Sequence, residues 1–241
     1  FSSHWQASRK KERGMHFGWI EGLFVAELVA AIFAAELRDL RWATCALALH
    51  SLLLVAIISG FGYLSGSHAL YWWAVTAFVL KGFLIPLLLW VYVRKMPTAE
   101  VRPTVGLIPS IVGMAIVLPA TYYFAHTYLY HHHLEDYVRP VYQGIANDAG
   151  VNLGLGFALF ALGIYVILVR RDIIKAVIGL VILENGVHLT LVSLAPTLEE
   201  AAEIGMACIL VVASWLLLYL AINIHKLWET RDSTSLSELK W

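Results

Sequence analysis

The stretch ILVVASWLLLYL, from Ile209 to Leu220, is apolar on nearly every face. The same holds for VIGLVIL, from Val177 to Leu183. Strands of a membrane β-barrel need segments of about ten residues in which apolar and polar side chains alternate, and neither stretch alternates. These segments therefore predict membrane-spanning helices, and we expect the chain to be an all-α, polytopic membrane protein.

The composition indicates the same class. Of the 241 residues, 60% are hydrophobic and 14% are charged, whereas a soluble domain carries about 25% charged residues. The 17 Lys and Arg residues equal the 17 Asp and Glu residues, so the chain lacks the basic excess of a nucleic-acid-binding protein. Its two cysteines, Cys45 and Cys208, cannot supply the four thiolates of an iron–sulfur cluster. Any redox metal must therefore lie in a partner or be bound by histidine.

Seven stretches approach the length of about 20 apolar residues that a membrane span requires. They are predicted at 17–36, 42–64, 69–93, 104–127, 150–169, 173–194 and 204–225. The chain accordingly divides into a polar N-terminal extension (1–15), a four-helix membrane part (16–127), an external loop (128–149), a three-helix membrane part (150–226) and a cytoplasmic tail (227–241).

The positions of Lys and Arg predict the orientation, because positive charge in short loops is retained on the cytoplasmic side. The loops after the first, third and fifth predicted helices and the tail hold eleven basic residues: Arg38, Arg41, Arg94, Lys95, Arg102, Arg170, Arg171, Lys175, Lys226, Arg231 and Lys240. Past residue 15 the opposite side holds Arg139 alone, so we expect the C-terminus in the cytoplasm and the N-terminus outside. The basic residues between Arg9 and Arg13 disagree with this orientation. They belong either to a processed or upstream extension or to a site for anionic headgroups or a partner protein.

Five ionisable side chains fall inside the predicted spans: Glu27, His50, Lys81, Glu184 and His188. A charge at the bilayer centre costs about 2.5–3.5 kcal/mol, so such residues usually face the bundle interior and mark ion or proton pathways. Glu184 and His188 are four residues apart and share one face of their helix. We expect the five to form a hydrated ion pathway. The alternative is a set of static, paired contacts that fix helix packing, and His50 taken alone fits an interhelical hydrogen bond better.

Two further motifs are weaker signals. The tandem histidines 131–133, with Glu135 and Asp136, contain metal-ligating groups, but a solvated polar loop explains them better, and no metal site is predicted. Gly154 and Gly156 lie in an apolar helix rather than after a strand, so they indicate close helix packing and not a dinucleotide site.

Residues near the predicted helix ends are expected at the level of the lipid headgroups. Three carboxylates are expected to be wet and interfacial there: Glu21, Glu36 and Glu203. Six tryptophans are expected to be interfacial anchors: Trp19, Trp42, Trp72, Trp73, Trp90 and Trp228.

The sequence IGLVILENGVHL, from Ile178 to Leu189, leads to a more specific hypothesis. It is preceded by LVRRDIIKAV and followed by LAPTLEEAAEIGMA. Together these segments resemble component E of the hydrogenase-4 type of formate hydrogenlyase, in which a basic turn, an ENG-x-HL core and an E-I-G segment recur. The stretch TAFVLKGFLIPLLLWVYVRKMP, from Thr76 to Pro97, also resembles the third helix of that family, with its intramembrane lysine followed by a proline. The resemblance covers the second to seventh predicted helices and the tail TSLSELKW.

Residues from Asn152 to the C-terminus are also similar, more distantly, to the K subunit of respiratory complex I and to the C subunit of multisubunit cation/proton antiporters. The resemblance implies that Glu184 is the protonatable carboxylate of its helix, with His188 as its neighbour, and that Lys81 is the family lysine. In the complex I relative the carboxylate falls at Val181, three residues earlier on the same helix face.

This sequence also departs from its relatives. The second membrane carboxylate of the complex I subunit would fall near Ala213, and component E proteins carry an acidic residue near Ile209, but this chain has neither. Without an acidic residue at either position, the last helix lacks the carboxylate that a proton relay through it would use. Glu27 has no counterpart in the first helix of the family, and it is either a local replacement or a shielded partner of Lys81.

The resemblance implies a non-catalytic membrane subunit of a complex I-related complex built around a membrane-bound NiFe hydrogenase or a formate-oxidising module. It would contribute to redox-coupled translocation of protons or Na⁺. Its partners would be antiporter-like membrane subunits, a membrane subunit like the H subunit of complex I, and peripheral NiFe hydrogenase-like and Fe–S subunits. No cofactor is expected in this chain itself. The complex would lie in the cytoplasmic (inner) membrane of a bacterium or archaeon.

Three other functions are open on the sequence. The chain could be a structural subunit that packs between neighbouring subunits and seals the contact, with buried charges that fix how the helices align. It could be a b-type cytochrome with His50 and His188 as axial ligands, although neither helix carries the second histidine of a two-haem bundle. A free-standing secondary transporter is the third, although an odd number of helices without an inverted repeat disfavours it.

Overall fold

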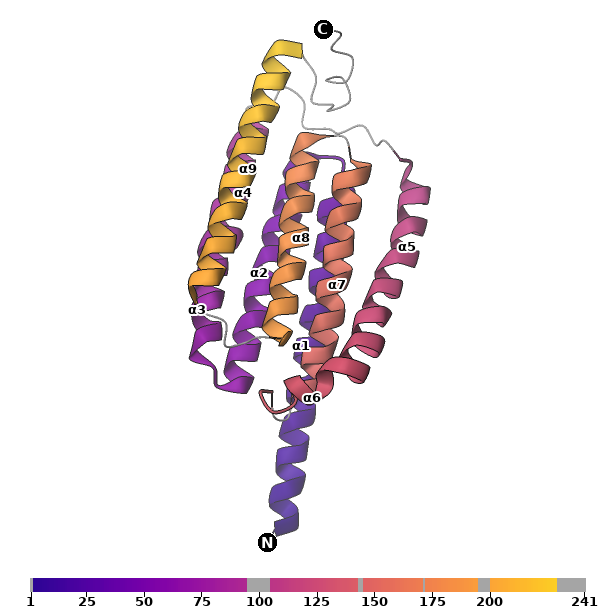
Figure 1. The fold of residues 1–241 in the computed structure, drawn as a ribbon, viewed down its shortest axis with the longest axis vertical. Helices are drawn as coiled ribbons and strands as arrows, with labels where there is room; N and C mark the ends of the chain where they lie inside the picture. The colour runs from indigo at the N-terminus through magenta and orange to yellow at the C-terminus, as the bar shows by residue number, and fades with distance from the viewer. Residues whose placement is uncertain (1, 95–104, 143–144, 171, 195–199, 229–241) are drawn as a thin grey trace.

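A computed structural model describes the backbone of residues 2–94, 105–142, 145–170, 172–194 and 200–228, and every regular element in these ranges is helical (Figure 1). Side chains are described between residues 19 and 223 of these ranges, except 200–203. The all-α prediction is confirmed for this part of the chain. The side chains of the predicted N-terminal extension (1–15) and of the predicted tail (227–241) lie outside it.

The helices match the predicted spans closely. They are α1 (Ser2–Glu36), α2 (Leu40–Ser65), α3 (His68–Ala77), η1 (Phe78–Leu84), α4 (Ile85–Arg94), α5 (Leu107–Tyr123), η2 (Phe124–Leu134), α6 (Glu135–Val138), α7 (Ala146–Val169), α8 (Ile173–Leu194) and α9 (Glu200–Trp228). The elements α3, η1 and α4 form one continuous helix, as do α5, η2 and α6. Because the second of these helices continues to Val138, the connection to α7 is shorter than the predicted loop 128–149.

Six of these helices are long and apolar enough to cross a membrane among the residues that the structure describes. They correspond to the second to seventh predicted spans. The first predicted span, 17–36, is the C-terminal half of α1, and α1 is not among the six. Its described residues include three carboxylates, Glu21, Glu27 and Glu36, which lower its apolar character. The prediction of seven spans therefore stays a prediction, as does the orientation.

The helices form one bundle in which α7 and α8 make the closest pair (Figure 1). Glycines permit this approach. A Cβ added at Gly163 would lie 2.5 Å from the backbone nitrogen of Leu183, and one added at Gly186 would lie 2.5 Å from the carbonyl oxygen of Gly156. Gly156 thus packs against the backbone of α8, and Gly154 packs against the ring of Tyr122. The prediction that these two glycines serve close packing is confirmed.

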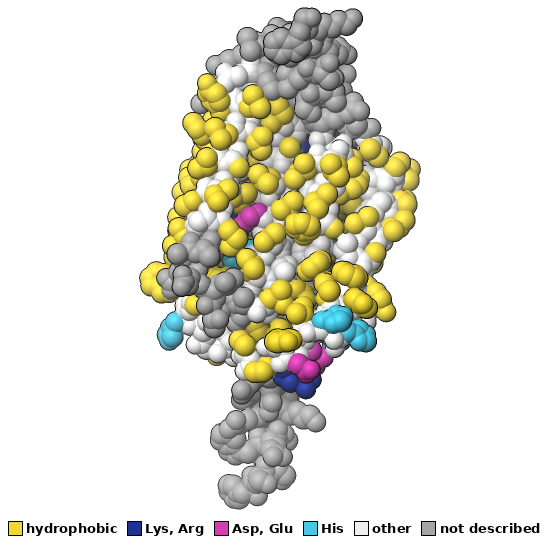
Figure 2. All heavy atoms as spheres, viewed as in Figure 1, with side chains coloured by type: hydrophobic (Ala, Val, Ile, Leu, Met, Phe, Trp, Pro, Cys, Tyr) yellow, Lys and Arg dark blue, Asp and Glu magenta, His cyan; other side chains and the backbone are white. Residues whose placement is uncertain are grey.

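The outer surface of the bundle is apolar. Hydrophobic side chains cover most of the face drawn in Figure 2, and acidic and histidine side chains reach this surface at mid-height and near the lower end. Large hydrophobic residues such as Ile108, Leu168 and Ile209 are more than two-thirds exposed. An exposed apolar belt of this kind is what a bilayer or neighbouring membrane helices would cover.

Candidate functional site

The residue at the centre of the candidate site is Lys81, which lies in the short π-helical segment η1. The local sequence explains this segment. Pro86 lacks a backbone N–H, and its ring would clash with the carbonyl of Gly82 in a regular α-helix. The helix widens before the proline, and the N–H of Ile85 donates to the carbonyl of Leu80, five residues earlier. Such π-helical turns are frequent at functional sites, and this one sits midway along the helix from His68 to Arg94.

The ammonium group of Lys81 contacts two side chains of α8. Its Nζ lies 2.5 Å from Oε2 of Glu184 and 2.7 Å from Nδ1 of His188. Lys81 and His188 are almost fully buried, whereas Glu184 is 15% exposed. An ammonium can donate hydrogen bonds and cannot accept them, so Nδ1 of His188 is the acceptor and the proton of the neutral ring is on Nε2. The prediction that Glu184 and His188 share one face of their helix is confirmed, and that face points at Lys81.

The ring of His188 also packs against the ring of Trp73. The two rings meet edge to face with centroids 5.5 Å apart, and Trp73 is 1% exposed. The prediction that Trp73 is an interfacial anchor is therefore wrong, while Trp42 and Trp72 are well exposed as expected. Trp72 and Trp73 are adjacent in the sequence, and composition alone could not tell which of them faces the core. The side chain of Trp228 lies outside the described part.

A second buried pair lies beside Lys81. Oε1 of Glu27, in α1, is 3.8 Å from Nδ1 of His50, in α2, and both side chains are fully buried. This separation exceeds a hydrogen bond. Within the described part of the chain, neither carboxylate oxygen of Glu27 and neither ring nitrogen of His50 has a hydrogen-bond partner. Lys81 is close enough to interact electrostatically with both.

The structure thus brings together all five residues that the sequence singled out inside the membrane. They come from α1, α2, η1 and α8, and Lys81 connects the pair Glu27 and His50 to the pair Glu184 and His188. Carboxylates and imidazoles can bind and release protons, and a buried ammonium requires carboxylates nearby to balance its charge. Chemically, the arrangement can hold charged groups in the middle of the bundle.

Another set of polar residues joins the helix ends on the side where α1 ends and α8 begins. Oε1 of Glu36 accepts hydrogen bonds from Arg170 and Ser110, each at 2.6 Å, and Ser110 also contacts the hydroxyl of Tyr165 at 2.6 Å. Glu36 lies at a helix end as expected, but it is less exposed than a wet carboxylate would be, because its side chain is 13% exposed and pairs with an almost buried arginine. Lys175 is also buried and donates to the backbone carbonyls of Ala34 and Ala35.

The opposite end of the bundle is closed by tyrosines. Tyr142 is buried and donates to the carbonyl of Val192, and Tyr130 donates to the carbonyl of Ala146. Burial raises the pKa of Tyr142, so its hydroxyl keeps its proton and remains a donor.

The exposed ring of His131 contacts Glu135 at 2.9 Å on the helix that was predicted to be a loop. The side chain of Glu203 lies outside the described part.

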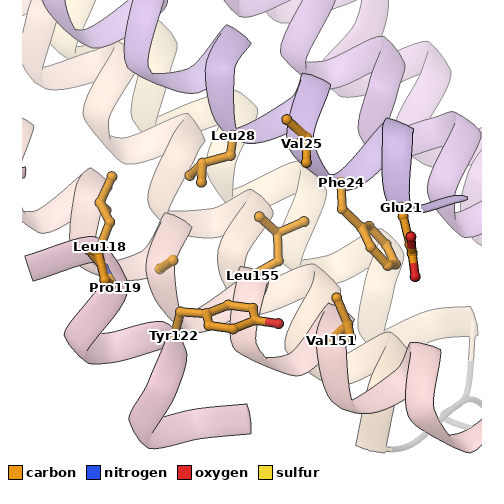
Figure 3. A pocket seen from close by; sticks show the side chains of 10 residues that line it. Glu21, Phe24, Val25, Leu28, Leu118, Pro119, Tyr122, Val151 and Leu155 are labelled. Carbon is orange, nitrogen blue, oxygen red and sulfur yellow. The ribbon is translucent and has the colours of Figure 1, made fainter. Parts of the chain in front are cut away.

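A cavity of about 420 Å³ opens between α1, α5 and α7 (Figure 3). Its walls are mostly apolar, with Phe24, Leu28 and Leu155 among them, and Glu21 and Tyr122 add polar groups to the lining (Figure 3). It does not contain the five intramembrane residues. This cavity is therefore distinct from the candidate site around Lys81.

Comparison with known proteins identifies relatives of this chain. The chain is 27% identical to hydrogenase-4 component E from Escherichia coli (strain K12) over 213 residues, which are 88% of this chain and 93% of that protein. The same component from Escherichia coli O157:H7 and from Shigella flexneri matches equally. Residues 152–241 match the family model of NADH-ubiquinone/plastoquinone oxidoreductase chain 4L. No solved structure matches the chain. The chain is thus homologous to hydrogenase-4 component E, and the resemblance seen in the sequence is confirmed.

Proposed function

We propose that this homologue of hydrogenase-4 component E is a membrane subunit of a complex I-related, hydrogenase-type complex and that it helps to move protons or Na⁺ across the membrane. The observation that carries the proposal is the contact of Lys81 with both Glu184 and His188 inside the bundle. The similarity over nearly the whole chain to a hydrogenase component and the match to a complex I chain family support the assembly in which it works.

In this function the chain carries no redox centre. Electron transfer takes place in peripheral NiFe hydrogenase-like and Fe–S subunits, and antiporter-like membrane subunits use the energy that it releases. Moving one charge against 100 mV costs about 2.3 kcal/mol. The chain contributes a polar axis from Glu27 and His50 through Lys81 to Glu184 and His188, along which a change of charge at one end is felt at the other.

The proposal includes α1 as a seventh span. Side chains of α1 such as Phe24, Ala31 and Ala34 belong to the same hydrophobic core as the six apolar helices. Glu27, which lowers the apolar character of α1, is fully buried against His50 and does not face lipid. With seven spans and the basic residues at the ends of α1, α4 and α7, the C-terminus lies in the cytoplasm and the N-terminus outside.

The test is the variant Glu184→Gln in the native complex. It keeps the size of the side chain and removes its charge, so we expect reduced ion uptake into membrane vesicles for each complex that assembles. Glu135→Gln is the matched control, because Glu135 lies on α6 at the end of the bundle and pairs with His131 and Arg139. Normal ion uptake by Glu184→Gln would remove the axis from the mechanism.

The second candidate is a structural subunit whose buried charges fix helix register. The observation that favours it is the direct, short contact between Lys81 and Glu184, which would also suit a static pair. The same variant separates the two functions. Loss of assembly with Glu184→Gln, without a separate transport defect, would support the structural role.

A further inference from the structure

We propose that the outer face of α8 is a docking surface for a membrane-spanning helix of another subunit, and that this helix presents a hydrogen-bond donor to Glu184. The inference deepens the proposed function, since it requires that the chain works in a multisubunit complex. It does not require ion transfer. It rests on the spacing of the exposed residues of α8, on a neighbouring groove and on the exposure of one carboxylate.

Six of the eight incompletely buried residues of α8 follow a regular spacing, while the other two, Leu183 and Thr190, adjoin glycines of α7. A stripe with steps of four, four, three, four and three residues consists of Ala176, Leu180, Glu184, Val187, Leu191 and Leu194. Core positions between them, such as Val177, Val181 and Leu189, are fully buried. The five steps span 18 residues, so these side chains form one continuous face of α8, along which a second helix can pack. We call these six residues the α8 outer stripe.

A groove lies beside the lower half of the α8 outer stripe. It has a volume of about 220 Å³ and is lined by Phe157 and Phe160 of α7 and by Val187, Thr190 and Leu191 of α8. Its lining is almost entirely apolar. A bulky apolar side chain of a neighbouring helix would fill such a groove, as in other packed helix pairs.

Glu184 lies midway along the length of the α8 outer stripe, at the edge next to the inward-facing His188, and it makes this surface unsuited to lipid. Its side chain is 15% exposed, and its contact within the described residues is Lys81 on the inner side. Hydrocarbon chains can cover Leu180 and Val187 but cannot donate a hydrogen bond to a carboxylate.

A membrane helix with a donor side chain at the same depth would cover the apolar residues of the stripe and would also hydrogen-bond to Glu184. Side chains such as Ser, Thr, Asn, Gln or His commonly hydrogen-bond between membrane helices. The occupant is thus identified by its chemistry as a transmembrane helix with an apolar face, one bulky side chain for the groove and one donor opposite Glu184. A lipid is the competing occupant, and the experiment distinguishes the two.

The test uses the intact complex, isolated from native membranes through a tag on this chain. Benzoylphenylalanine is placed at Val187 on the α8 outer stripe or, as the matched control, at Ile116, which is 65% exposed on α5. After irradiation, we expect Val187 to crosslink to the central part of a membrane-spanning helix of another subunit, identified by mass spectrometry, with a donor residue within one turn. Leu180, on the other side of Glu184, provides a second position if the probe at Val187 prevents assembly.

Crosslinks from both Val187 and Leu180 to lipid alone would overturn the inference, as would a partner helix without a donor at that depth. The outcome is independent of the transport test. If Glu184→Gln stops ion uptake while the probes at Val187 and Leu180 crosslink to lipid alone, the proposed function stands and the docking surface does not. If Val187 meets a helix while Glu184→Gln transports normally, the docking surface stands and the ion axis does not.

Discussion

Nζ of Lys81 lies 2.5 Å from Oε2 of Glu184, although the two residues come from different halves of the chain and from helices that are not consecutive. Lys81 is fully buried, so its charge depends on this carboxylate for compensation. The same ammonium contacts His188 and interacts with Glu27 and His50. This one contact therefore joins the intramembrane ionisable residues into a single network.

The network makes a prediction for stability. Removing one partner of a buried ion pair leaves an uncompensated charge and costs about 3–5 kcal/mol, whereas replacing both partners with neutral groups can be nearly neutral. We expect Lys81→Met to lower the midpoint of thermal unfolding in detergent, and we expect the double variant Lys81→Met, Glu184→Gln to recover most of the loss. A double variant that is less stable than Lys81→Met would contradict the pairing.

The tautomer of His188 is a second prediction. Because the ammonium of Lys81 donates to Nδ1, the ring proton should be on Nε2. Nitrogen NMR of the chain with labelled histidine should show this tautomer for His188, and Lys81→Met should weaken the preference and shift the Nδ1 signal. The exposed ring of His131 serves as the reference, and its signals should not change with Lys81→Met.

Close contact between α7 and α8 predicts the effect of a single methyl group. A Cβ at Gly163 would lie 2.5 Å from the backbone of Leu183, which cannot move aside as a flexible side chain could. Overpacking of this kind costs about 1–3 kcal/mol, so Gly163→Ala should lower the thermal midpoint. Gly22→Ala in α1 is the control, since nothing lies within 4 Å of its added Cβ. Equal midpoints for the two variants would show that α7 and α8 lie farther apart.

The pair of Glu36 and Arg170 should behave as a structural contact. It ties the end of α1 to the end of α7 with an N–O distance of 2.6 Å, and it is separate from the network of Lys81. Glu36→Gln should reduce stability, because Arg170 is 6% exposed and would lose its carboxylate. Ion uptake per assembled complex should stay unchanged, as measured in the same vesicles. A transport defect at normal complex levels would place this pair in the ion pathway.

Much of the fold follows from hydropathy along the sequence. The span predicted at 173–194 coincides with α8, and the span predicted at 69–93 differs by one residue at each end from the helix His68–Arg94. Long apolar runs bounded by charges and turn residues determine where helices begin and end. The N-terminal extension of α1 and the continuation through η2 and α6 were missed, because these polar segments are helical without being apolar.

The site could be predicted in part for a physical reason. An ionisable residue in an apolar helix is conspicuous, so its cost in lipid identifies Glu27, His50, Lys81, Glu184 and His188 from the sequence. Partners in other helices leave no such signal. The packing of Trp73 on His188 and the pairing of Glu36 with Arg170 depend on how helices are rotated and arranged, and hydropathy does not specify either.

The most direct test of the central claim is ion uptake by the complex that carries the double variant Lys81→Met, Glu184→Gln. This variant removes both charges of the central pair and should still assemble. The control is the double variant Arg170→Met, Glu36→Gln, which removes the ion pair at the helix ends. We predict that the Lys81 and Glu184 double variant loses ion uptake at normal complex levels while the control retains it. Normal ion uptake by the Lys81 and Glu184 double variant would contradict the account.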